Sequence, residues 1–188
     1  MPLYPTMLPF PRGKTYTQGA FDPDDHLTEN ENLEGFLCSV PNPDYPGEEI
    51  LLRVVRYVDA DGDPLTGAPK VVEFDSGELG REITGYADAA GAVGKPLDPM
   101  YNGVTIEAND LVYVIEAGKV TLTKASGVAI SEGDLVLSNN AGAITNTGTG
   151  CVIGVAVKAA EAAATTVVVD VFPGVSTRKT DQGGEHTA

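Results

Sequence analysis

Residues 110–123 read DLVYVIEAGKVTLT and residues 134–147 read DLVLSNNAGAITNT, so one pattern occurs twice at a fixed offset. Seven of the 14 aligned pairs are identical, among them Asp110 with Asp134. Each copy is an apolar run, an Ala-Gly pair and an alternating run, which is the pattern of a β-hairpin. Two copies are too few for a solenoid. We therefore expect two paired hairpins that curl into one small β-barrel or β-sandwich (β-tulip-like) core over residues 101–175.

The composition favours the same fold class. The chain has 188 residues, of which 42% are apolar, enough for one domain with a core. Aromatic residues make up 6%, Trp is absent, and there are 22 glycines and 13 prolines. Such a composition suits short strands and turns better than helices. The sequence therefore predicts a mostly β protein.

The charge excludes several kinds of partner. The 27 acidic residues exceed the 12 basic ones, which gives a net charge of −15 and a pI near 4.3. Such a surface repels a phosphate backbone, and the sequence offers no basic segment for a membrane surface and no apolar run of the roughly 18 residues that span a bilayer. We expect neither nucleic acid nor a membrane as partner. The acidity fits a high-salt, halophilic milieu or an exposed surface present in many copies, and both explanations stay open.

The two cysteines, Cys38 and Cys151, lie far apart in the sequence and outside any CxxC pair. Two cysteines do not make a disulfide framework. We expect two free thiols that act as small apolar residues, with a single bridge between them as the alternative.

Residues 1–47 differ from the rest of the chain, because they hold eight of the 13 prolines. Proline fixes φ and lacks an N–H, which predicts an extended arm without helix or central strand. Apolar side chains are interleaved with the prolines and cannot form a core alone, since ordering the backbone costs about 1–2 kcal/mol per residue. We expect the arm to dock on its own chain or on a neighbour, with a disordered tail as the alternative. The candidate contact residues are Leu3, Tyr4, Met7, Leu8, Phe10, Tyr16 and Phe21.

Residues 48–100 are expected to hold a β-hairpin followed by a long loop. The stretch EEILLRVVRYVD supplies one strand and KVVEFD the returning strand, which places the hairpin at residues 48–75. Residues 76–100 are rich in Gly and Ala and predict a long surface loop with at most one short helical turn. The polar residues 176–188 predict a flexible tail.

Two acidic stretches are candidate cation sites. Asp59, Asp61 and Asp63 match the first ligand positions of an EF-hand loop, but Pro64 stands where that loop needs Gly and Lys70 where it needs Glu. We reject the EF-hand and keep the three aspartates as a weak cation site. The other stretch, Asp22, Asp24, Asp25 and His26, is better explained as a solvated loop.

The sequence lacks the usual signatures of catalysis. It contains two histidines, His26 and His186, and no GxSxG, GxxxxGK[ST] or GxGxxG motif. No nucleophile and base stand in a recognisable context. We predict no catalytic residues, no cofactor and no enzymatic activity.

The C-terminal stretch GDLVLSNNAGAITNTGTGCVIGVAVKAAEAAATTVVVDVFPG, residues 133–174, resembles the capsid decoration (cement) proteins of tailed bacteriophages and related viruses. The shared elements are a Gly-Asp-x-Val strand, a hairpin to a Thr-containing strand, Ile-Gly-x-Ala at residues 153–156, an Ala-rich turn and an alternating Val strand. Residues 1–100 have no counterpart in this resemblance.

The resemblance implies a structural virion protein on the outside of the capsid, commonly a homotrimer, which stabilises the shell by bridging major capsid protein subunits. Its partners would be the major capsid protein and its own copies, and the arm would act as a staple. Two other functions stay open: another β-type virion component, such as a head fibre, turret or spike base, and a secreted β-domain that binds sugar or a cation.

Overall fold

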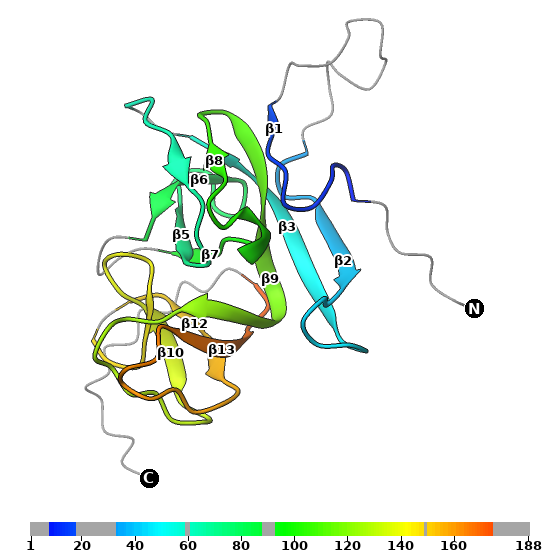
Figure 1. Cartoon of the computed structure of the whole chain (residues 1–188). Coiled ribbons are helices and arrows are strands. Elements are labelled where there is room, and N and C mark those ends of the chain that lie inside the picture. The colour runs from blue at the N-terminus through cyan, green and yellow to red at the C-terminus, as the bar shows by residue number, and fades with distance from the viewer. Residues whose placement is uncertain (1–7, 18–32, 59–60, 88–92, 149, 175–188) are drawn as a thin grey trace, which may run out of the picture.

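The computed structural model describes residues 8–17, 33–58, 61–87, 93–148 and 150–174. The fold is mostly β, with a sheet that curls into a half-barrel, which confirms the predicted fold class (Figure 1). The elements are β1 (Tyr16–Thr17), β2 (Leu37–Pro41), β3 (Glu49–Tyr57), β4 (Leu65–Thr66), β5 (Val71–Phe74), β6 (Glu82–Tyr86), β7 (Gly94–Pro96), the 3-10 helix η1 (Pro99–Tyr101), β8 (Thr105–Ile106), β9 (Asp110–Thr123), β10 (Leu135–Ser138), β11 (Ile144–Thr145), β12 (Val152–Ala156) and β13 (Thr166–Val171).

The main sheet runs in the order β11-β10-β12-β13-β9-β3-β6-β5-β7, with β1 added to β9 and β2 added to β3. Strands β4 and β8 form a separate pair. Strand β9 stands at the centre of this order, and in Figure 1 it runs from the β3 side of the molecule into the lobe of β10, β12 and β13. The two parts of the sheet are therefore joined through one strand.

The predicted hairpin over residues 110–123 is wrong, because these residues form the single 14-residue strand β9. Its first half pairs with β3 as far as Ala117, and its second half, from Gly118, pairs with β13. Gly118 has φ +109, and a Cβ there would lie 2.9 Å from the Glu49 carbonyl oxygen. The Ala-Gly pair thus marks the point where a continuous strand changes partners.

The second copy does form the predicted hairpin, with β10 antiparallel to β11. Asn139 Oδ1 accepts hydrogen bonds from the N–H groups of Ala141 (3.0 Å) and Ala143 (2.9 Å), which closes the turn. The first copy has Ile115 where the second has Asn139, so it lacks the side chain that makes this turn. The alternating Val strand of the resemblance is confirmed as β13, and the Ile-Gly-x-Ala element lies in β12.

The predicted hairpin over residues 48–75 is also wrong. Its two strands exist as β3 and β5, but β6 lies between them. Strand β6 pairs with β3 in parallel and with β5 antiparallel. The expected surface loop over residues 76–100 accordingly contains β6, β7 and the helix η1. The predicted tail over residues 176–188 lies outside the described residues.

One core extends through both parts of the sheet. Its fully buried side chains include Leu52, Ile83, Leu97 and Ile115 in the β3 part and Leu122 near β13. Both Cys38 and Cys151 are buried thiols outside any disulfide, as the sequence predicts. In the described part of the chain, no helix has the length and apolar character to cross a membrane.

Candidate functional site

Residues 8–17 of the predicted arm are docked on the body of their own chain, while residues 37–41 of the predicted arm form β2 and belong to that body. Phe10 is only 5% exposed, and its ring stacks on the ring of Tyr113 with centroids 4.3 Å apart and on that of Tyr16 with centroids 5.5 Å apart. The Tyr113 hydroxyl donates to the Phe10 carbonyl oxygen (2.7 Å) and accepts from the Phe10 N–H (3.2 Å). Phe10 therefore belongs to the core, and the site that receives it uses both stacking and backbone recognition.

An ion pair holds the next turn of the arm. Arg12 donates from Nε and Nη2 to the two carboxylate oxygens of Asp98, at 2.6 and 3.0 Å. The Asp98 side chain is fully buried, and its Oδ1 also caps η1 by accepting from the Met100 N–H (3.0 Å). A bidentate pair of this kind fixes orientation as well as distance.

Two further contacts complete the site that we call the arm anchor, formed by residues 10–17 and the groups that hold them. The Tyr101 hydroxyl donates to the Lys14 carbonyl oxygen (3.1 Å) and accepts from the Tyr113 N–H (3.1 Å). The Thr17 hydroxyl donates to Asp110 Oδ1 (2.6 Å), next to the short β1–β9 pairing. Directed hydrogen bonds therefore hold the segment from Phe10 to Thr17 along its whole length.

The internal repeat explains the role of Asp110. Asp110 Oδ2 accepts from the N–H three residues before it, that of Glu107, and Asp134 Oδ2 accepts in the same way from the N–H of Ser131. In the second copy Asp134 also accepts from Asn146, which follows β11, and in the first copy Thr17 of the arm takes that place. Strand β1 lies on the edge of β9 opposite β3, as β11 lies on the edge of β10 opposite β12.

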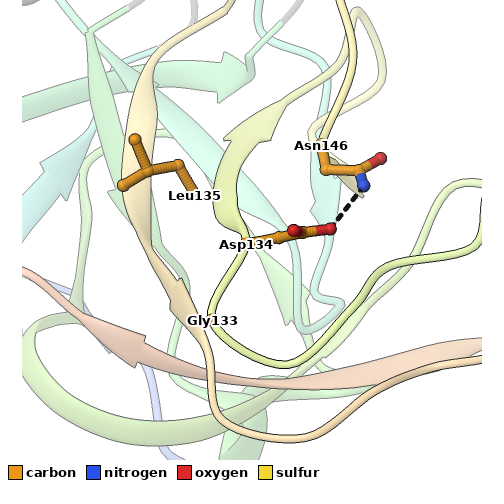
Figure 2. Close-up of a pocket in the computed structure, with 4 residues that line it drawn as sticks. All are labelled: Gly133, Asp134, Leu135 and Asn146. Carbon is orange, nitrogen blue, oxygen red and sulfur yellow. Dashed lines mark hydrogen bonds between the residues drawn. The ribbon is translucent and has the colours of Figure 1, made fainter.

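A shallow pocket lies beside the second copy, lined by Gly133, Asp134, Leu135 and Asn146 (Figure 2). Figure 2 shows the Asp134 carboxylate facing the Asn146 amide, which donates to it at 2.7 Å. The hydrogen bonds from the Ser131 N–H and the Asn146 amide lower the pKa of Asp134. Among the described residues that line the pocket, Asp134 is the single carboxylate. Its contacts close the turn before β10, so local structure explains the pocket.

Large apolar side chains are exposed at several places. Leu37 begins β2 and Phe36 directly precedes it, and Leu79 lies in the turn between β5 and β6. The Phe36 and Arg81 carbonyls accept from Val54 and Arg56 on one edge of β3, so the two segments adjoin. We call Phe36, Leu37 and Leu79 the edge patch. Among the described residues, the other exposed large apolar side chains are Met100, Leu135 and Phe172.

The candidate contact residues of the arm fall into two groups. Leu8 and Tyr16 are half-buried and Phe10 is buried. Leu3, Tyr4, Met7 and Phe21 lie outside the described residues. The sequence singled out Phe10 and Tyr16 as apolar groups that need a partner, but it gave no sign of Asp98, which is 86 positions from Arg12.

The weak cation site receives no support from the described residues. Asp61 and Asp63 are exposed, while Asp59 lies outside the described part. The Asp63 carbonyl oxygen accepts from the Tyr57 hydroxyl (2.8 Å). Among the residues that are placed, no three His, Cys, Asp or Glu side chains gather as metal ligands. His26 and its acidic neighbours are also outside the described ranges.

Buried thiol and phenol groups in the arm anchor and on β2 predict a loss of stability at alkaline pH. Burial, and then the charge of Asp98, raises the pKa of Cys38 from about 9 to about 11, and burial raises the pKa of Tyr101 and Tyr113. The unfolded chain therefore releases these protons first, so stability is retained below pH 9 and falls as the pH rises from 9 to 11. We expect urea titrations to show this fall, and Cys38→Ala to remove about 2–3 kcal/mol of it.

Other titrating groups do not reverse this expectation. Burial also raises the pKa of Tyr86, to about 12, and of Cys151, whereas burial lowers the pKa of Lys95 and acts in the opposite direction. Burial lowers the pKa of Arg56 as well, whereas the hydrogen bond with Glu48 raises the pKa of Lys119, so two cations oppose five acids and one cation. A free energy of unfolding that stays constant from pH 8 to pH 11 would contradict the prediction.

Comparison with known proteins identifies the family. The family model described as phage cement protein matches residues 70–171, more than half of the chain. It covers most of the region whose sequence resembles these proteins and reaches back to β5. A search of curated proteins finds no match. The chain therefore belongs to the phage cement protein family, which consists of structural, non-enzymatic virion proteins located on the exterior of the capsid.

Proposed function

We propose that this protein is a non-catalytic staple that binds the outside of the shell and bridges major capsid protein subunits through its N-terminal arm. The observation that carries the proposal is the arm anchor. A staple transmits force between subunits only if its arm is fixed to its body. Stacking of Phe10, the buried Arg12–Asp98 pair and the hydrogen bonds of Tyr101 and Tyr113 supply that fixed point.

The anchor divides the candidate contact residues by role. Phe10 and Tyr16 stack within the chain, so we assign them to holding the arm. We assign contact with the capsid to Leu3, Tyr4, Met7, Leu8 and Phe21. Apolar side chains on an extended segment suit insertion between neighbouring subunits.

The body offers a second surface for the capsid. The edge patch exposes Phe36, Leu37 and Leu79, each between 44% and 46%. It lies beside β2, which among the described residues pairs with β3 alone. An exposed apolar group next to a strand edge suits docking against another protein.

We further propose that the protein acts as a homotrimer. Three arms on one body would strengthen capsid binding through multivalency without a high affinity for each arm. The acidic surface would keep the outside of the particle hydrated, and it is compatible with a halophilic host.

Deletion of residues 1–7 tests the staple. We expect the truncated protein to keep its Tm, because the anchor begins after the deletion, and to lose co-sedimentation with capsids stripped of the native protein. Deletion of residues 182–188 removes the same length from the other end and serves as the matched control, with binding retained. Undiminished binding after deletion of residues 1–7 would refute the arm as the bridging element.

A further inference from the structure

The site on β9 that receives the arm has the properties of a strand position. The first repeat copy has no return strand of its own. Strand β1 pairs with Asp110 and Leu111 on the edge of β9 that corresponds to the β11 edge of β10, and Leu97 bridges Val114 further along that edge, where the second copy pairs Ser138 with β11. The arm thus covers the start of this edge from a distant part of the sequence. Nothing in these contacts requires the arm and the site to belong to the same molecule.

The stretch of chain between Thr17 and Glu34 is much longer than the distance between these two residues requires. Thr17 pairs with Asp110 on β9, and Glu34 forms an ion pair with Arg56 on β3, the strand next to β9. Thr17 and Glu34 are separated by three strand spacings of about 4.8 Å, from β1 to β9, from β9 to β3 and from β3 to the segment of Glu34 beside it. This distance is about 15 Å. The sixteen residues between Thr17 and Glu34 can reach about 55 Å. The connection can therefore reach a neighbouring molecule.

Exchange of the arm would preserve every contact of the anchor. Phe10 would stack on Tyr113, and Arg12 would pair with Asp98, in a neighbour as they do within one chain. The two arrangements differ only in the entropy of closing the connection, which changes slowly with its length. In an oligomer, the high local concentration of neighbouring sites favours such an exchange.

We propose that, in the assembled oligomer, residues 8–17 of one copy occupy the strand position on β9 of another copy. This inference rests on the self-association in the proposed function. It assigns the anchor two tasks, which are to fix the arm and to link the copies. An exchanged arm would make each site incomplete without the neighbouring chain.

Cysteine pairs placed on different copies test the exchange. Thr17 and Asp110 are Cα partners, so we would co-express a Thr17→Cys chain with an Asp110→Cys chain. Exchange is expected to give a disulfide between the two chains, which doubles the mass of the band on a non-reducing gel. The control pair is Ser39→Cys with Leu51→Cys, which are Cα partners across the short turn between β2 and β3 and should not link two copies.

A second measurement leaves Asp110 intact. A photo-crosslinking amino acid at the exposed Thr17, in an oligomer mixed from isotopically light and heavy copies, should give products that join a light arm to a heavy β9. Products within single copies alone, from a protein that light scattering shows to be oligomeric, would overturn the exchange. A protein that stays monomeric at all concentrations would overturn the proposed self-association as well. The proposed capsid binding is tested separately by co-sedimentation, so the two proposals can fail independently.

Discussion

Arg12→Met is expected to lower the free energy of unfolding by about 3 kcal/mol or more. The reason lies with its partner, because the Asp98 carboxylate is fully buried and receives two hydrogen bonds from the guanidinium. Without Arg12, the Met100 N–H remains as its partner among the described residues. A stranded buried carboxylate costs far more than the loss of a surface contact. Urea or thermal denaturation of the free protein measures the effect.

Lys14→Met is the matched control, since Lys14 is an exposed cation two positions further along the same segment. It should change stability by no more than about 0.5 kcal/mol. Adding Asp98→Asn to Arg12→Met should recover part of the loss, because the second change removes the stranded charge. Equal stabilities for Arg12→Met and Lys14→Met would show that the arm is not fixed by this pair. Through the proposed anchor, Arg12→Met should also weaken capsid binding.

Much of the β10–β13 region follows from the sequence because its signals are local. The alternating valines of β13 and the Asn-containing turn after β10 act over a few residues. The same reasoning failed for β9. An Ala-Gly pair reads as a turn, but Gly118 instead allows a close approach to Glu49 where the strand changes partners. A pattern over 14 residues cannot show that each half has a different distant partner.

The β3–β6 pairing and the arm anchor depend on contacts over long sequence distances. Strand β6 contains Gly85 and lies in a region rich in Gly and Ala, so it carries little β signal of its own. Its parallel pairing with β3 is determined by contacts with residues distant in the sequence, which a local pattern does not contain. In the anchor, the arm's need for a partner is visible in Phe10, whereas Tyr113 lies 103 positions away.

A second buried charge cluster joins the two parts of the sheet. Glu116 lies on β9 just before the change of partners, where its carboxylate accepts from Arg53 Nε (2.7 Å) and from the Gly174 N–H (2.6 Å). Lys95 on β7 lies 3.8 Å from the same carboxylate and donates to the carbonyl oxygens of Glu116 and Phe172. The side chains of Glu116 and Lys95 are each 3% exposed. The cluster therefore ties β3, β7, β9 and the end of β13 together.

Glu116→Gln is expected to cost about 3–5 kcal/mol, because it leaves two cations without their carboxylate, one of them deeply buried. For a chain of this size the loss corresponds to a fall in Tm of about 10 °C. Glu48→Gln is the control, since Glu48 pairs with Lys119 on the surface, where 40% and 29% of the two side chains are exposed. That change should cost far less than Glu116→Gln, because solvent screens an exposed ion pair.

The pH dependence of the Glu116→Gln effect separates a stranded charge from a packing defect. Burial lowers the pKa of Lys95 below its usual 10.5, while Glu116 acts to raise it, so the variant should lower this pKa further. The unfolded chain then binds the Lys95 proton more tightly than the folded variant does. Rising pH therefore favours the folded variant until Lys95 is neutral in both states, and the stability gap to the wild type should narrow as the pH approaches 10.5. A gap that stays constant with pH would assign the loss to altered packing around β9.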